Sequence, residues 1–455
     1  NRPNRNRLPM MTDPQTARMG VSLLKEIEVF DGNTLHDLPV EYPAGPARCV
    51  LCGQDASGER TYVRMDEELL SRHMMLLGGI GTGKTNAFYQ IISQLRRGMT
   101  DQDVMIVFDT KGDFYQSFYR PGDVVISNDA TACGPEGPDY WNLFNELEPG
   151  EDMEVAINEI SKTLFAQRLK NTTQPFFPNA AKDLFGAVLA HFSRNQGSFY
   201  CDNRAMRQFM DAMPTAQLRE MLEQHPDLRA MTSYIYDDAS GQTQGVLSEL
   251  QQQVRELFIG NFKKRGTLSM RELVRQKGGR MIFVEYDLSV GGTLTPIYTL
   301  LFDLAIKEAL SRKKSEGNVF FAVDEFRLLP NLTHIDDAVN FGRSMGVKFM
   351  VGLQNIEQMY EVYGQARARS ILSGFLTSIC FRVNDHTSVE YVQQLHGRNR
   401  KKEVYMAAVQ GRGIVENVRD ANVVEDWDIQ RLKIGEAIIG LPGREPFRFQ
   451  FLRAK

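Results

Sequence analysis

The sequence predicts an α/β fold with a largely parallel central sheet and an inserted all-α domain. Fully apolar runs that end in acidic residues recur along the chain, as at 103–109 and 319–325. Such runs are typical of strands that are buried on both faces of a parallel sheet. Segments with helical spacing alternate with these runs. Between about 176 and 262 the apolar runs stop and only helical patterns remain, which favours a separate helical domain.

Composition excludes several classes of protein. The chain has 455 residues, enough for two or three domains, and its 42% hydrophobic and 24% charged residues are typical of a globular protein. The net charge of −4 means that any contact with nucleic acid must come from local patches. Five cysteines are too few for a disulfide framework. No window reaches the ~18 apolar residues of a membrane span.

The start of the chain predicts an arm and then a strand pair. Residues 1–45 are polar apart from a short mixed segment at 23–30, and we interpret them as an arm. Residues 46–77 are predicted to form a strand pair that leads into a buried strand at 74–77, with Gly53 and Gly58 marking a turn.

A phosphate-binding loop follows this buried strand. The helical spacing of residues 86–97 begins directly after a glycine-rich turn that fits G-x-x-x-x-G-K-[ST]. Glycines let the backbone N–H groups approach a polyphosphate, and the helix start adds the positive end of its dipole. Lys84 is predicted to reach the β- and γ-phosphates of ATP, and the Thr85 hydroxyl to bind Mg²⁺. The predicted ATP-binding residues of the loop are Gly78, Gly79, Ile80, Gly81, Thr82, Gly83, Lys84 and Thr85.

The next strands place further polar residues beside this loop. The run 103–109 ends at Asp109, and functional sites of open α/β sheets lie at the carboxyl ends of strands. We therefore add Asp109 to the ATP-binding residues. A short strand is expected at 123–127, and acidic residues at 146–161 suggest a solvated helical face.

Helical patterns then replace the strands. They cover 176–192, 205–213, 216–222 and 244–258, with prolines and glycines between them. The strand pattern resumes at 280–286, and a long helix is expected over 295–313.

An apolar run followed by Asp324-Glu325 has the Walker B pattern. Asp324 would bind Mg²⁺, and Glu325 would orient and polarise the attacking water. A strand-end salt bridge is the alternative for this pair. Gln354 ends the next predicted strand, 347–354, where its amide could hold the γ-phosphate or the water, or simply cap the strand. A further strand at 375–383 and a hairpin of 436–441 with 447–451 complete the pattern.

An ordered series of short motifs resembles a known family. The series consists of Arg72-His73, the phosphate loop, residues 108–113, Trp141-Asn142, Phe176-Phe177, Asp324-Glu325-Phe326, Gly342-Arg343, residues 352–354, Tyr363-Gly364 and residues 381–385. It resembles the coupling proteins of bacterial type IV secretion and conjugation, the TraD-, TraG- and TrwB-like ATPases. The resemblance covers nearly all of residues 46–455.

The resemblance implies a RecA-like nucleotide-binding domain, formed by 46–165 and 266–455, with the all-α insertion at 166–265. It implies a homo-hexameric ring at the cytoplasmic face of the bacterial inner membrane. Such an ATPase receives a relaxase–DNA complex or effector proteins and helps to move single-stranded DNA and protein into the secretion channel. Family members usually carry an N-terminal membrane anchor, which this sequence does not show. The family's trans-acting arginine matches Arg343, eleven residues before Gln354.

Two basic clusters are candidates for DNA contact. The first lies within 255–280 and the second within 398–402. Channels that follow a phosphate backbone need such charge, although a charged run is often only a solvated face. The candidate DNA-binding residues are Lys263, Lys264, Arg265, Arg398 and Arg400.

Two alternative functions share most of these features. One is a double-strand DNA pump of the FtsK/HerA type, whose nucleotide-binding core would have the same motifs. The other is a docking receptor, in which the helical domain recognises protein substrates and a weak ATPase gates their transfer. The negative net charge suits the receptor.

Overall fold

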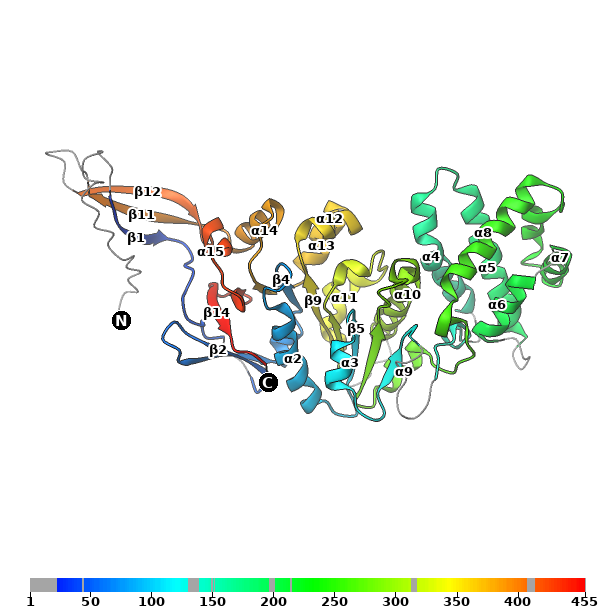
Figure 1. Cartoon of the computed structure of the whole chain (residues 1–455), viewed down its shortest axis with the longest axis horizontal. Coiled ribbons are helices and arrows are strands. Elements are labelled where there is room, and N and C mark those ends of the chain that lie inside the picture. The colour runs from blue at the N-terminus through cyan, green and yellow to red at the C-terminus, as the bar shows by residue number, and fades with distance from the viewer. Residues whose placement is uncertain are drawn as a thin grey trace.

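The computed structural model describes residues 23–42, 45–129, 139–148, 150, 152–195, 201–212, 215–311, 317–406 and 414–454. Residues 1–22 of the expected arm lie outside this set. A large sheet occupies the middle of the molecule, a helical body lies at one end, and a small three-stranded sheet lies at the other (Figure 1). Among the described helices, none has the length and apolar character that a bilayer span requires.

Seven neighbouring strands of the large sheet run parallel, as predicted. Their spatial order is β10 (Thr377–Cys380), β4 (Met74–Leu77), β9 (Val347–Leu353), β8 (Val319–Val323), β5 (Val104–Asp109), β7 (Arg280–Glu285) and β6 (Val124–Ile126). Most of their residues are buried because helices cover both faces. Because these strands run in the same direction, their carboxyl ends lie along one side of the sheet, which we call the carboxyl edge. Their amino ends lie along the opposite side, which we call the amino edge.

Four antiparallel strands extend the sheet beyond β10. They are β13 (Glu436–Gly440), β14 (Phe447–Phe451), β2 (Ala47–Gln54) and β3 (Arg60–Asp66). The two predicted hairpins, β2–β3 and β13–β14, are both present. They are joined because β14 also pairs with β2, with Gln450 opposite Gln54. A Cβ on Gly53 would lie 2.6 Å from the Gln450 carbonyl oxygen, so only glycine fits this junction.

Alternate residues of the strands face two apolar cores. Met74 and Leu76 of β4 pack on the side of α2 (Lys84–Gly98), whose residues Phe88, Ile91 and Ile92 are fully buried. α3 (Asp113–Phe118) joins this layer. The other core contains residues of α9 (Met270–Gln276), α10 (Gly291–Ala309), α11 (Ile335–Phe341), α12 (Ile356–Tyr363), α13 (Gln365–Ser373) and α14 (His386–His396). Short helices α1 (Glu67–Leu70) and α15 (Asp426–Gln430) lie in connections.

The helical body consists mainly of five helices. They are α4 (Met153–Asn171), α5 (Phe176–Arg194), α6 (Asn203–Ala212), α7 (Thr215–Glu223) and α8 (Gly241–Leu257). Its apolar interior is continuous with the core that contains α10. Position 166 lies inside α4, so the helices begin earlier than the expected boundary. The division of the chain into domains stays a prediction.

A small antiparallel sheet lies at the end opposite the helical body (Figure 1). It joins β1 (Leu23–Asp31), β11 (Arg398–Met406) and β12 (Ile414–Asn422). The mixed segment that we expected in an arm is therefore a strand. It was not predicted because its pairing partner lies far along the chain. The following residues are also anchored, since the Thr34 N–H donates to the Glu445 carboxylate at 2.9 Å.

Candidate functional site

The glycine-rich turn after β4 has the backbone that its sequence requires. Gly81 and Gly83 have φ values of 73° and 119°, in the region that favours glycine. The Gly79 N–H donates to the Arg382 carbonyl oxygen at 3.1 Å. A Cβ on Gly78 would lie 2.6 Å from the Phe381 Cβ, so the segment after β10 leaves no room for a side chain there. Ile80 is 84% exposed at the tip of the turn.

Two threonines flank the lysine of this loop. The Thr82 hydroxyl donates to the Gly79 carbonyl oxygen at 2.8 Å, and the Thr82 carbonyl accepts from the Gly435 N–H at 2.8 Å. Thr85 is partly buried in the first turn of α2. Thr82 therefore braces the loop, while Thr85 lies where the motif places a metal ligand.

Lys84 is a buried cation at the start of α2. The residue is 7% exposed, and its ammonium donates to the carbonyl oxygens of Gly78 and, at 3.2 Å, of Gly79. Burial lowers the pKa of Lys84, while the charges of Asp324 and Glu325 act in the opposite direction. The lysine has no ion pair within the described residues, so an anionic ligand would complete its environment.

The two Walker B acids follow β8 at the same edge. Asp324 is buried, and burial raises its pKa to about 6 despite the opposing charge of Lys84. The Glu325 carboxylate accepts a hydrogen bond from the Gln354 amide at 2.7 Å. Glu325 also lies 3.5 Å from the Arg327 guanidinium. The structure thus brings Glu325 and Gln354 together from adjacent strand ends.

The Asp109 carboxylate is hydrogen-bonded within its own turn and is not free to contact the phosphate loop. One carboxylate oxygen accepts from the Lys111 N–H at 3.3 Å and the other from the Tyr115 N–H at 2.8 Å. The Tyr89 hydroxyl of α2 donates to the Asp113 carbonyl oxygen at 3.0 Å, which ties this turn to the phosphate-loop helix.

Lys111 is a cation of this site that sequence reasoning missed. Burial is the main cause of the lowered pKa of Lys84 and the raised pKa of Asp324. The charge of Lys111 adds to the first shift and opposes the second, so the three groups share one electrostatic environment. A lysine two residues after an acidic strand end, beside a glycine-rich loop, was the signal that could have identified it.

Arg343 lies at the opposite edge of the sheet. It belongs to a single 3₁₀ turn, Gly342–Met345, that precedes β9. Its side chain is 55% exposed and lies 3.2 Å from the Glu68 carboxylate. β9 has seven residues, so at ~3.3 Å a residue about 20 Å separates its two ends. Arg343 therefore does not meet Gln354 within one chain.

The first basic cluster is largely occupied by local contacts. The Lys264 ammonium donates to the Asn261 amide oxygen at 2.9 Å and lies over the Tyr140 ring. Arg265 lies 3.8 Å from the Asp202 carboxylate, and Lys263 is exposed. Further along, Arg275 pairs with Glu308 and Glu148.

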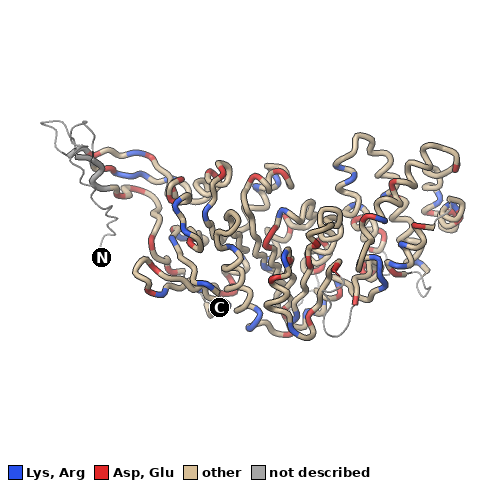
Figure 2. Tube along the Cα trace, in the orientation of Figure 1, with Lys and Arg blue, Asp and Glu red and all other residues tan. Residues whose placement is uncertain are grey.

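The second basic cluster is matched by acids of the neighbouring elements. Arg400 lies 3.5 Å from Asp420, and Lys402 2.9 Å from Glu416. Lys401 lies 3.1 Å from Glu425, while Arg398 is exposed. The two clusters lie toward opposite ends of the molecule (Figure 2), so they do not form one surface. DNA contact by either cluster stays a prediction.

Comparison with known families gives a match over most of the chain. Residues 61–447 match the family described as the type IV secretion-system coupling protein DNA-binding domain. The coupling protein TraD of Escherichia coli K12 is 25% identical over an alignment of 447 residues, which covers 92% of this chain and 58% of TraD. The coupling protein VirD4 of Bartonella henselae is 21% identical over 67% of this chain and 50% of VirD4. The chain thus spans only about half of the length of these curated relatives.

Solved structures share the fold. The conjugative coupling protein TrwB, in an unbound form lacking its N-terminal region, superposes with a TM-score of 0.69 at 19% identity, covering 86% of this chain and 87% of TrwB. TrwB with a non-hydrolysable ATP analogue gives a TM-score of 0.70 at 18% identity over 96% of both chains. VirB4 of Thermoanaerobacter pseudethanolicus gives 0.54 at 13% identity, covering 91% of this chain and 98% of VirB4. This chain therefore has the P-loop NTPase fold of these proteins.

Proposed function

This chain belongs to the family of type IV secretion-system coupling proteins, and from that membership we propose that it hydrolyses ATP with Mg²⁺ to drive or gate substrate transfer into a secretion channel. Its substrates would be a relaxase with its single-stranded DNA, or effector proteins. Its place of action would be the cytoplasmic face of the bacterial inner membrane. The related TrwB has been crystallised with ADP and Mg²⁺ and with an ATP analogue, which supports the choice of nucleotide.

The convergence of Lys84, Glu325 and Gln354 at the carboxyl edge is the observation that carries this proposal. Lys84 would exchange its carbonyl contacts for the β- and γ-phosphates of ATP. Glu325, held by the Gln354 amide, would accept a hydrogen bond from the attacking water and orient it. Through this hydrogen bond, Gln354 would couple the position of the Glu325 carboxylate to the presence of a γ-phosphate.

Mg²⁺ fits the oxygen donors next to Lys84. Within the described residues no group donates a hydrogen bond to the buried Asp324 carboxylate, although burial leaves it few water contacts. Asp324 and the Thr85 hydroxyl would hold the cation, which neutralises phosphate charge when bound. The positive charge would also favour the ionised form of Asp324.

Arg343 gives a reason to propose a ring. An arginine about one strand length from its own Gln354 can assist hydrolysis only in a neighbouring copy. Half exposed and held by a single surface ion pair, it is free to leave Glu68 for a partner's phosphates. We propose a homo-hexamer in which each Arg343 completes the site of the next subunit.

A docking receptor is the second candidate, because the helical body exposes aromatic side chains away from the nucleotide site. Phe176 and Tyr236 are 45% and 64% exposed, and Phe176 packs edge-to-face on Tyr234. Exposed aromatic residues are frequent anchors of protein interfaces. In this case the helical body would bind relaxase or effector proteins, and ATP hydrolysis would be slow.

The test is the steady-state ATPase rate as a function of protein concentration, with single-stranded DNA, with duplex DNA and with neither. Wild type would be compared with Lys84→Ala and Arg343→Ala, and with Arg97→Ala as a matched exposed arginine on α2. We expect a rate per subunit that rises with concentration and with single-stranded DNA. Lys84→Ala and Arg343→Ala should abolish it, and Arg97→Ala should not.

The remaining outcomes distinguish the alternatives. Nucleotide binding with negligible turnover under all conditions, together with binding of relaxase or effector, would favour the receptor. Length-dependent translocation on duplex DNA would favour a pump of the FtsK/HerA type. Turnover that is unaffected by Lys84→Ala would contradict the proposal itself.

A further inference from the structure

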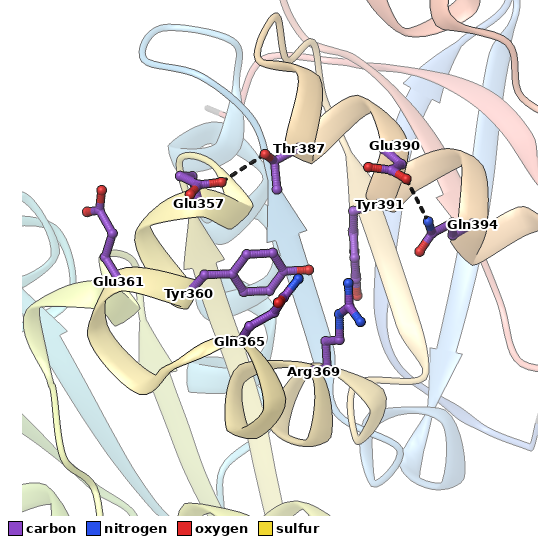
Figure 3. Close-up of a pocket in the computed structure, with 9 residues that line it drawn as sticks. All are labelled: Glu357, Tyr360, Glu361, Gln365, Arg369, Thr387, Glu390, Tyr391 and Gln394. Carbon is purple, nitrogen blue, oxygen red and sulfur yellow. Dashed lines mark hydrogen bonds between the residues drawn. The ribbon is translucent and has the colours of Figure 1, made fainter.

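A pocket lies between α12, α13 and α14, separate from the phosphate loop (Figure 3). Its volume is about 390 Å³, within the usual size range of ligand sites. Glu357, Tyr360 and Glu361 of α12 line it, with Arg369 of α13 and with Glu390 and Tyr391 of α14. None of these residues has a part in the nucleotide chemistry proposed above.

The charges around this pocket are not paired with one another. Among the described residues, no ion pair involves Glu357, Glu361, Arg369 or Glu390. Glu357 accepts from the Thr387 hydroxyl at 2.8 Å, and Glu390 accepts from the Gln394 amide at 3.1 Å. Three carboxylates and one guanidinium thus line the pocket, whereas the acids beside the second basic cluster are paired with cations.

Two tyrosines give the pocket aromatic walls. Tyr360 points toward the hollow from α12 and Tyr391 from α14 (Figure 3). The Arg369 guanidinium lies 5.8 Å from the centre of the Tyr360 ring, so this ring already accommodates a cation on one side. A negative rim with aromatic walls is an environment that favours a lysine or arginine side chain.

We propose that this pocket is a docking site for a lysine- or arginine-bearing segment of a partner protein. A cationic side chain would lie against Tyr360 and Tyr391, with its charge between Glu357 and Glu390. Nucleic acid is disfavoured because the carboxylates outnumber the cation three to one and would repel a phosphate backbone.

The pocket is connected to the nucleotide site by its own walls. α12 begins two residues after Gln354, and its Ile356 N–H donates to the Ser388 hydroxyl of α14 at 2.8 Å. α14 follows Arg382, whose carbonyl accepts from the Gly79 N–H of the phosphate loop. A segment bound between α12 and α14 would therefore contact one helix that follows Gln354 and another that follows the residue bonded to the phosphate loop.

Fluorescence anisotropy on the full chain without nucleotide tests this docking site. The probes are a labelled peptide of alternating arginine and glycine, one of alternating glutamate and glycine, and a labelled single-stranded oligonucleotide. The double variant Glu357→Gln/Glu390→Gln should bind the arginine peptide about tenfold more weakly. Glu220→Gln/Glu223→Gln on α7 removes the same charge from exposed acids elsewhere and should change binding less than twofold.

Arg369→Gln provides a test of opposite sign, which a variant that merely misfolds cannot pass. It removes the only cation of the pocket, so the arginine peptide should bind about threefold more tightly. Equal loss in both glutamate double variants, or no binding by wild type, would overturn the proposal. Tighter binding of the oligonucleotide, weakened by Arg369→Gln, would make this a nucleic-acid site instead. Lys84→Ala should bind the peptide normally, so failure of the ATPase proposal is a separate result.

Discussion

The two ends of α2 each carry a buried cation, in contrasting surroundings. At its start, Lys84 donates to backbone carbonyl oxygens and has acids only at longer range. At its end, Arg96 makes two hydrogen bonds to the Asp123 carboxylate, at 2.8 and 2.7 Å, and a third to the Gly279 carbonyl oxygen. Burial lowers the pKa of both cations, but only Arg96 has a directly bonded carboxylate.

This contrast indicates which buried charges serve function. A cation that is directly bonded to a carboxylate of the fold holds elements together, as Arg96 joins α2 to the residues that precede β6 and β7. A buried cation that donates only to backbone carbonyl oxygens, as Lys84 does, can still form an ion pair with a ligand. We therefore expect substitutions of buried charged residues at the carboxyl edge to change turnover, and substitutions of buried charged residues at the amino edge to change stability.

The largest effect is expected at the carboxyl edge, for Glu325→Gln. Turnover should fall about 10³-fold because the water loses its orienting carboxylate, while nucleotide affinity and the free energy of unfolding should change little. Single-turnover ATP hydrolysis, nucleotide titration and urea unfolding measure these three quantities. A large loss of stability with normal turnover would contradict the comparison.

The amino-edge counterpart is Arg96→Met. It leaves the buried Asp123 carboxylate without its cation, and we expect a loss of about 3 kcal/mol in the free energy of unfolding. Urea unfolding would measure it, with Arg97→Met as the control at the neighbouring exposed position. Nucleotide affinity should stay within twofold of wild type wherever the variant remains folded.

A buried histidine at the amino edge sharpens the same contrast through pH. Burial, with the nearby charge of Lys348, lowers the pKa of His73 to about 4, and its Nδ1 accepts from the Phe349 N–H at 3.1 Å. The folded pKa is below the unfolded value near 6.5, so this stabilisation is present above pH 6.5 and is lost as pH falls toward 4. Between pH 7 and 5 the loss from His73 should be about 2 kcal/mol.

His73→Asn tests that assignment. Asparagine tolerates the positive φ of 58° at this position and supplies an acceptor oxygen. The variant should be less stable at pH 7 but lose about 2 kcal/mol less than wild type between pH 7 and 5 in urea unfolding. An unchanged pH dependence would show that His73 is not the group that titrates.

The smallest effect is expected for Tyr89→Phe, in the middle of α2. The change removes hydrogen bonds to the Asp113 carbonyl and the Ser117 hydroxyl, which are partly open to solvent, so we expect about 1 kcal/mol or less. The turn that presents Lys111 should loosen, and the dissociation constant for ATP should rise severalfold. Equilibrium nucleotide binding measures the second effect. An unchanged affinity would show that Lys111 does not contribute to ATP binding.

Local patterns made much of the fold and site predictable. The apolar runs of β5 and β8 specify buried parallel strands, and the motif from Gly78 to Thr85 specifies its own turn. Glu325 and Gln354 were separately assigned to strand ends, and parallel neighbours bring such ends together. These features depend on residues close in sequence, so their pattern is visible without a structure.

Long-range pairings and side-chain partners were not predictable in this way. The charges at 398–402 suggested DNA contact, which stays a prediction, but the sequence did not show that Lys402 and Arg400 face Glu416 and Asp420 across a strand pair. The Asp109 carboxylate accepts hydrogen bonds from two backbone N–H groups, and these bonds depend on how the turn folds back on itself. The partner of β1 lies more than 360 positions away, and no local periodicity identifies it.

The position of β14 has a consequence for how this protein is made. β14 lies between β13 and the β2–β3 hairpin, so the pairing of Gln54 with Gln450 joins segments that are 396 positions apart. A ribosome must complete residues 447–451 before that hairpin can join the sheet. Until then the β2 edge stays open to other chains, a state in which chaperones commonly protect nascent proteins. The nucleotide site has a similar dependence, because the Gly435 N–H that supports Thr82 is synthesised 353 positions after it.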